Sequence, residues 1–237
     1  MHTFDRILEL REASIALNSA SAYFRADDDK FTDPVKVKYF AEIDRNLAML
    51  PEDAWKQIKI DLVNRIAVRH PTRGWQPLFD IFNEVRAYNY LQDMGYEDIR
   101  FIPRAKANNL RTPDLEAVHN DTPILCEVKT INTSDKELHR RATHGVGTSS
   151  TVVEEKLLTK LSSDITAAKN QMDAYNPDAR KIAYVVINFD DWVGDYAEEH
   201  LAQIEDFFRH TLRPGVDLVT DVRTPFLTKV TLYSEAA

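Results

Sequence analysis

The residues best suited to chemistry are concentrated in one stretch, TPDLEAVHNDTPILCEVKT, at positions 112–130. Asn120 and Asp121 can form the two central residues of a tight turn, which predicts a hairpin of two short strands. In the register set by that turn, His119 pairs with Thr122, and Asp114 lies directly opposite Glu127. The sequence therefore predicts two carboxylates facing each other on one surface of a sheet.

Opposed carboxylates repel each other and destabilise a strand pair, so a compensating charge is expected. A divalent cation is the simplest candidate, because carboxylates and water are ligands that suit Mg²⁺ or Mn²⁺. Lys129 follows Glu127 by two residues and lies on the same face. Its ammonium could position an attacking water and stabilise a charged transition state, or it could act after losing its proton beside the metal. Glu116 is a possible further acid on this face.

Composition excludes several other classes of protein. The chain has 237 residues, of which 43% are hydrophobic and 29% are charged, as in a globular protein. A single cysteine, Cys126, excludes an internal disulfide and a four-cysteine metal site. The sequence has no glycine-rich phosphate-binding motif and no segment apolar enough to span a membrane. Its first residues are charged, which is not expected of a secretory signal. We expect a cytoplasmic protein with no membrane partner.

The net charge of −8 argues against a nucleic-acid partner, but the charge is unevenly distributed. Residues 1–98 carry a net charge of −4, residues 99–181 carry +2, and residues 182–237 carry −6. The middle segment is therefore the part of the chain that would not repel a polyanion. Its basic side chains include Arg100, Arg104, Lys106, Arg111, Arg140 and Arg141.

The pattern of apolar residues predicts the elements that must position these groups. A 3.6-residue period predicts helices over 4–17, 35–50, 54–68 and from about Gln76 to Met94, the last ending at Gly95. Alternation then predicts strands over 99–103, 113–119 and 124–131, followed by a helix over 152–175. The continuous apolar run at 181–189 predicts a buried strand, with a helix at 195–210 and a last strand at 226–233. The fold class is α/β, with a helical extension or subdomain at 1–73 and the site-bearing domain at 74–237.

Pro113-Asp114 followed by Glu127-Val128-Lys129 resembles the signature of the PD-(D/E)XK nuclease superfamily, also called restriction-endonuclease-like. The predicted αβββαβ order over residues 76–189 matches the common core of that family, a mixed central sheet flanked by helices. Glu84 occupies the place of a glutamate that the family often carries on the helix before the first strand. Gln171 and Tyr175 match a Gln-x-x-x-Tyr pattern found in some members on the helix after the third strand.

The resemblance implies a role for each matching position. Asp114 and Glu127 would ligate Mg²⁺ or Mn²⁺ together with the Val128 carbonyl, and Glu84 would support the metal directly or through water. Lys129 would serve the attacking water. Gln171 and Tyr175 would contact the substrate backbone or order the site. Apart from the resemblance, the basic HRRATH segment predicts phosphate contacts from Arg140, Arg141 and His144, since such side chains often bind backbone phosphates.

These observations predict a metal-dependent nuclease that hydrolyses phosphodiester bonds, in DNA rather than RNA. By resemblance, phage defence and DNA repair are suitable settings, and a homodimer is left open. The alternative is a catalytically inactive module of the same fold that binds protein or nucleic acid, which the acidic flanks favour. A third alternative, a helical partner-binding scaffold, requires Asp114 and Glu127 to lie on opposite faces of the sheet.

Overall fold

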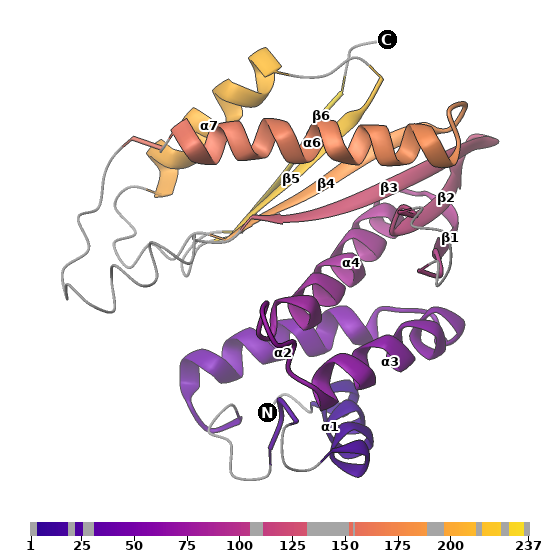
Figure 1. Cartoon of the computed structure of the whole chain (residues 1–237), viewed down its shortest axis with the longest axis vertical. Coiled ribbons are helices and arrows are strands. Elements are labelled where there is room, and N and C mark those ends of the chain that lie inside the picture. The colour runs from indigo at the N-terminus through magenta and orange to yellow at the C-terminus, as the bar shows by residue number, and fades with distance from the viewer. Residues whose placement is uncertain are drawn as a thin grey trace. The chain divides into compact units, whose positions relative to one another are not determined.

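The computed structural model describes residues 4–18, 22–25, 31–104, 111–131, 152–153, 155–188, 197–211, 215–223 and 228–234. The chain forms two compact units, Met1–Phe101 and Ile102–Ala237 (Figure 1). Within the described ranges, no helix is long and apolar enough to cross a lipid bilayer.

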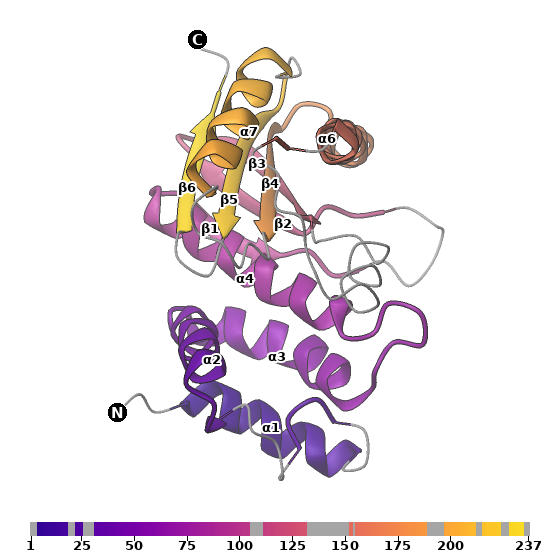
Figure 2. The same cartoon turned by 90° about the vertical axis from the view of Figure 1, so that its left-hand side faces the viewer.

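The first unit is mostly helical, as the 3.6-residue period predicts. Its elements are α1 (Asp5–Leu17), α2 (Pro34–Ala48), α3 (Glu52–Ala67), α4 (Gln76–Asp93) and β1 (Glu97–Phe101). α2 and α3 lie between α1 and α4 (Figure 2). α4 ends as predicted, because Gly95 takes a left-handed conformation with φ of 78° that most residues avoid. Leu47, Trp55, Leu62 and Ile81 are among the fully buried residues that hold these helices together.

The second unit is built on a mixed sheet. Its strands are β2 (Leu115–His119), β3 (Thr122–Ile131), β4 (Arg180–Asn188), β5 (Asp217–Arg223) and β6 (Thr228–Tyr233). β2 to β6 follow one another in the sheet in chain order. β3, β4 and β5 are parallel, whereas β2 and β6 run antiparallel to their neighbours. The predicted α/β class with a mixed sheet and flanking helices is therefore confirmed.

Two helices, α6 (Glu155–Tyr175) and α7 (Ala197–Thr211), cover one face of this sheet (Figures 1 and 2). α6 buries Leu161, Ile165, Ala168 and Met172, which are spaced to lie along one side of a helix. These side chains pack with every second residue of the parallel strands, such as Leu125 of β3. The same face of β3 carries Glu127 and Lys129, because side chains alternate along a strand.

The sequence-based expectations missed one strand of the sheet. β5 was not predicted, because aspartate is depleted in strands and this segment contains both Asp217 and Asp221. The boundary between the compact units falls after Phe101, whereas the expected domain boundary lies between residues 73 and 74. α4 packs against α2 and α3, which places it in the helical unit. The functional boundary at residue 73 stays a prediction.

Candidate active site

The hairpin that positions the carboxylates forms as predicted. Asn120 and Asp121 both have positive φ, 49° and 61°, which is the requirement of a type I′ two-residue turn. β2 and β3 pair from His119↔Thr122 to Leu115↔Cys126, so the predicted register is confirmed. Beyond the last regular pair, the backbone N–H of Asp114 donates to the carbonyl of Cys126 at 3.2 Å. Asp114 is therefore held at the level of Glu127.

The Asp114 and Glu127 side chains lie close to each other and to Lys129. Asp114 Oδ2 accepts a hydrogen bond from the backbone N–H of Val128 at 2.8 Å. Lys129 Nζ donates to Glu127 Oε1 at 2.5 Å. The Glu127 side chain is 5% exposed and that of Lys129 is 20% exposed. The site thus consists of two carboxyl groups and one ammonium group, at the edge of the hydrophobic core.

Burial raises the pKa of both carboxyl groups, and the charge of Asp114 adds to the effect on Glu127. Burial and the charge of Asp114 raise the pKa of Glu127 to about 7, although Lys129 opposes the shift. Burial also raises the pKa of Asp114, against the opposing effects of the Val128 N–H, Arg104 and Lys129. Desolvation and a neighbouring like charge both disfavour ionisation. Near neutral pH the pair therefore retains a proton that isolated carboxylates would have lost.

Gln171 joins the site from α6. Its Nε2 donates to Glu127 Oε2 at 2.7 Å and to the backbone carbonyl of Thr112 at 2.7 Å. One amide therefore links the third strand to the segment that precedes Asp114, and it fixes the carboxylate plane of Glu127. The carbonyl of Thr112 was not among the predicted site groups. Every residue has a main-chain carbonyl, so the residue types of a sequence do not indicate which carbonyl will accept a hydrogen bond from the site.

The remaining predicted site residues are not brought to this cluster by the described contacts. Tyr175 lies one turn beyond Gln171 at the end of α6 and is 45% exposed. Glu84 is buried on α4 of the first unit, so its part in the site stays a prediction. Three predicted phosphate contacts lie outside the described residues: Arg140, Arg141 and His144.

The chemistry of the donor set suits a hard divalent cation. Oxygen ligands from two carboxylates are what Mg²⁺ and Mn²⁺ prefer, and water completes such sites. Burial is the main cause of the raised pKa of both carboxyl groups, and a bound cation would favour their ionised forms. In the described part of the chain, no group of three or more His, Cys, Asp or Glu side chains is arranged to hold a metal. Asp114 and Glu127 would therefore need water or main-chain oxygen as further ligands.

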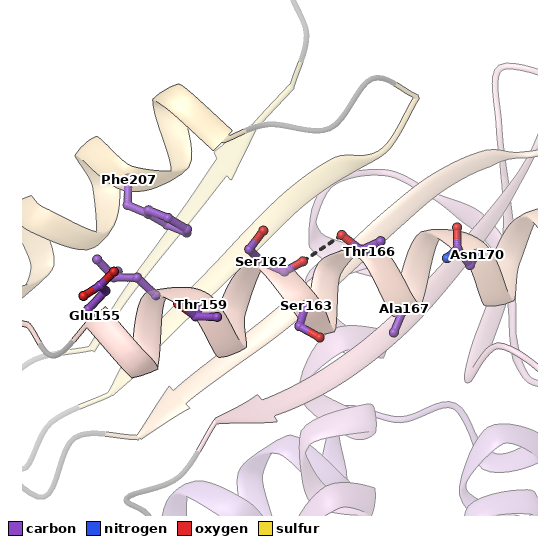
Figure 3. A pocket seen from close by; sticks show the side chains of 9 residues that line it. Glu155, Thr159, Ser162, Ser163, Thr166, Ala167, Asn170 and Phe207 are labelled. Atoms are coloured by element: carbon purple, nitrogen blue, oxygen red, sulfur yellow. Dashed lines mark hydrogen bonds between the residues drawn. The ribbon is translucent and has the colours of Figure 1, made fainter.

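A separate hollow of about 740 Å³ lies along α6 and beside α7 (Figure 3). Small polar side chains of α6 line it, together with Phe207 of α7. The hydroxyl of Thr166 donates to the backbone carbonyl of Ser162 at 2.8 Å, within the helix itself. None of the predicted site residues lines this hollow.

Comparison with known proteins gives no relative: no family model, curated protein or solved structure matches the chain. The function is therefore inferred from the geometry of the site and from the resemblance in its motif.

Proposed function

We propose that this protein is a metal-dependent nuclease that hydrolyses phosphodiester bonds, with DNA as the expected substrate. The observation that carries the proposal is the placement of Asp114 and Glu127 on one face of the hairpin, with Lys129 Nζ 2.5 Å from Glu127. The PD-(D/E)XK motif supports it, since these are the residues that the motif assigns to the reaction.

Each residue would have a defined task. Asp114 and Glu127 would hold the Mg²⁺ or Mn²⁺ ion, and Gln171 would keep the Glu127 carboxylate in its orientation. Bound there, the ion would lower the pKa of a coordinated water and neutralise charge on the phosphodiester. The Lys129 ammonium would position the attacking water beside phosphorus and stabilise the charge of the transition state. Glu84 and Tyr175 are retained as supporting residues on the resemblance.

The overall reaction is a hydrolysis. The water oxygen forms a bond to phosphorus while the bond from phosphorus to one ester oxygen breaks. The water loses a proton and the departing alkoxide gains one, so the products are a phosphomonoester end and a hydroxyl end.

The test is a cleavage panel of supercoiled plasmid, single-stranded DNA and RNA with Mg²⁺, Mn²⁺ or EDTA. We expect cleavage of DNA that requires the metal and falls by about 10²-fold or more in Lys129→Ala, because a preorganised charge at a transition state has that weight. Lys160→Ala is the matched control, since Lys160 is an exposed lysine of α6 that pairs with Asp164. If all three substrates survive, the inactive binding module is the better interpretation. If Lys129→Ala cleaves as fast as the wild type, another site is responsible.

A further inference from the structure

The connection between α3 and α4 is a basic stretch in an otherwise acidic unit. Residues 62–79 contain three arginines and one histidine but no aspartate or glutamate, whereas residues 1–98 as a whole carry a net charge of −4. Exposed charges are screened beyond about 10 Å at 0.1 M salt, so the local charge decides which ligand can approach. This stretch can therefore attract an anion that the unit as a whole would repel.

The centre of the stretch is a turn that hydrogen bonds hold in shape. His70 and Gly74 exchange two backbone hydrogen bonds, at 3.0 and 3.1 Å. Within the turn, His70 Nδ1 accepts from the backbone N–H of Thr72 at 3.3 Å and from that of Arg73 at 3.1 Å. Gly74 has φ of 58°, a conformation that favours glycine. The backbone of the turn is therefore ordered before any ligand binds.

Two guanidinium groups lie at this turn. That of Arg69 lies against Gly74, where a Cβ atom would be 3.5 Å from Nη2 and 3.8 Å from Nε. Arg73 Nη2 donates to Asp80 Oδ2 of α4 at 2.6 Å, which holds the second group in place. Arg69 is exposed, and the Arg73 side chain is 55% exposed. In the described part of the chain Arg69 forms no ion pair, so its charge is not offset as that of Arg73 is.

This arrangement suits a phosphate diester. A guanidinium presents N–H groups in a planar fork that fits two oxygens of one phosphate. Each phosphate of a nucleic-acid strand carries one negative charge, which matches the one uncompensated charge at the turn. Such contacts fix the position of a strand without reading its sequence.

We propose that the turn at 69–74 binds a backbone phosphate of the nucleic-acid substrate, with Arg69 as the main contact and Arg73 as a second donor. The ligand class rests on the proposed nuclease function. The site belongs to the helical unit and includes none of the residues of the carboxylate cluster, so it gives that unit a part in holding the substrate.

The experiment compares the wild type with Arg69→Ala, Arg69→Lys, Asp80→Asn and Lys56→Ala. Lys56 is the matched control, because it is an exposed cation of α3 that lies 3.9 Å from Glu52 and 4.0 Å from Asp53, outside the basic stretch. The first readout is the affinity for a labelled 20-nucleotide single-stranded DNA in Ca²⁺, measured by fluorescence anisotropy from 50 to 300 mM salt. The second is kcat and KM for cleavage of the same DNA with Mn²⁺.

We expect Arg69→Ala to reduce the slope of log affinity against log salt by about 0.7, the value of one contact to a single strand, and to weaken binding about fivefold at 0.1 M salt. Arg69→Lys should keep the slope, because it keeps the charge. Asp80→Asn should tighten binding by about two- to fivefold, because it removes the charge that offsets Arg73. Lys56→Ala should match the wild type.

In cleavage, Arg69→Ala should raise KM about fivefold and leave kcat unchanged, because the contact is the same in the ground state and the transition state. Equal losses of affinity in Arg69→Ala and Arg69→Lys, with no change in slope, would show a structural role and overturn the proposal.

Failure of this proposal is distinguishable from failure of the proposed function. If the wild type cleaves DNA and both Arg69→Ala and Asp80→Asn bind DNA as Lys56→Ala does, the phosphate site is overturned and the nuclease function stands. If the wild type binds DNA without cleaving it and Arg69→Ala still loses affinity and slope, the phosphate site stands and the nuclease function is overturned. If the wild type neither binds nor cleaves DNA, both proposals are overturned.

Discussion

Glu127 is the residue whose charge state decides the behaviour of the site. Its pKa of about 7 in the folded protein lies above the ordinary 4.5 for glutamate. The folded state therefore binds this proton more tightly than the unfolded state does. Stability from this group is present below pH 4.5 and is lost as the pH rises through 7.

Replacing Glu127 with glutamine should therefore stabilise the protein at pH 8 in EDTA by about 2 kcal/mol, because the buried charge is removed. At pH 4, where Glu127 is mostly protonated in both the folded and the unfolded protein, the difference should be close to zero. Urea unfolding at the two pH values measures this. Glu199→Gln, which changes an exposed residue of α7, is the control. Equal destabilisation at both pH values would contradict the expectation.

Gln171 is expected to act by positioning, since it donates to Glu127 and to the Thr112 carbonyl at 2.7 Å each. Gln171→Ala should lower metal-dependent cleavage by about 10–100-fold and raise the Mn²⁺ concentration needed for half-maximal rate, as the loss of a group that orients a metal ligand does. Circular dichroism checks that α6 is intact. An unchanged Mn²⁺ requirement would show that the amide does not order the ligand.

Residue spacing was enough to predict the centre of the site but not its surroundings. Asp114 and Glu127 meet because a two-residue turn fixes every cross-strand pair. Gln171 does reach Glu127 by a hydrogen bond, and whether it orders the site or contacts the substrate stays a prediction. The carbonyl of Thr112, which accepts from Gln171, carried no such signal, because a main-chain acceptor is present at every position of a sequence.

At the scale of elements, the β2–β3 hairpin brings the two carboxylates of the site together. Its turn places Asp121 at φ of 61°, a conformation that glycine adopts more readily than aspartate. Asp121→Gly should therefore raise the free energy of unfolding by about 0.5 kcal/mol and leave cleavage unchanged.

Asp121→Val should do the opposite, because a β-branched side chain is strained at positive φ. We expect a loss of about 1–2 kcal/mol in stability, which is the range for strained backbone positions. Urea unfolding of both variants measures the difference. Equal stability of the valine and glycine variants would indicate that the turn does not have the type I′ conformation.

β5 shows why the sequence predicted fewer strands than the fold contains. Asp221 of β5 is completely buried, and it is made acceptable by the Tyr184 hydroxyl, which donates at 2.9 Å, and by Arg223 Nη2 at 2.9 Å. Tyr184 belongs to the neighbouring strand. A strand signal that depends on a long-range partner cannot be recognised from local residue types, since buried polar groups need partners that local sequence does not reveal.

At the scale of the whole molecule, all the described acid, amine and amide groups of the site lie in the second compact unit. A divalent cation that binds there should stabilise this unit through mass action. If the two units unfold in separate thermal transitions, the cation should raise the midpoint temperature of the transition of Ile102–Ala237 and leave the other midpoint unchanged.

Thermal unfolding with and without Mn²⁺ tests this for the full chain. At 100 times its Kd the ion should contribute about 2.7 kcal/mol, which corresponds to a rise in Tm of roughly 5–10 °C for a chain of this size. The rise should be larger at pH 8 than at pH 6, because the ion competes with the proton that Glu127 holds with a pKa of about 7. Asp114→Asn should abolish it, and Asp164→Asn, at an exposed ion pair of α6, should not. A rise that survives in Asp114→Asn would place the ion elsewhere and remove the carboxylate pair from the mechanism.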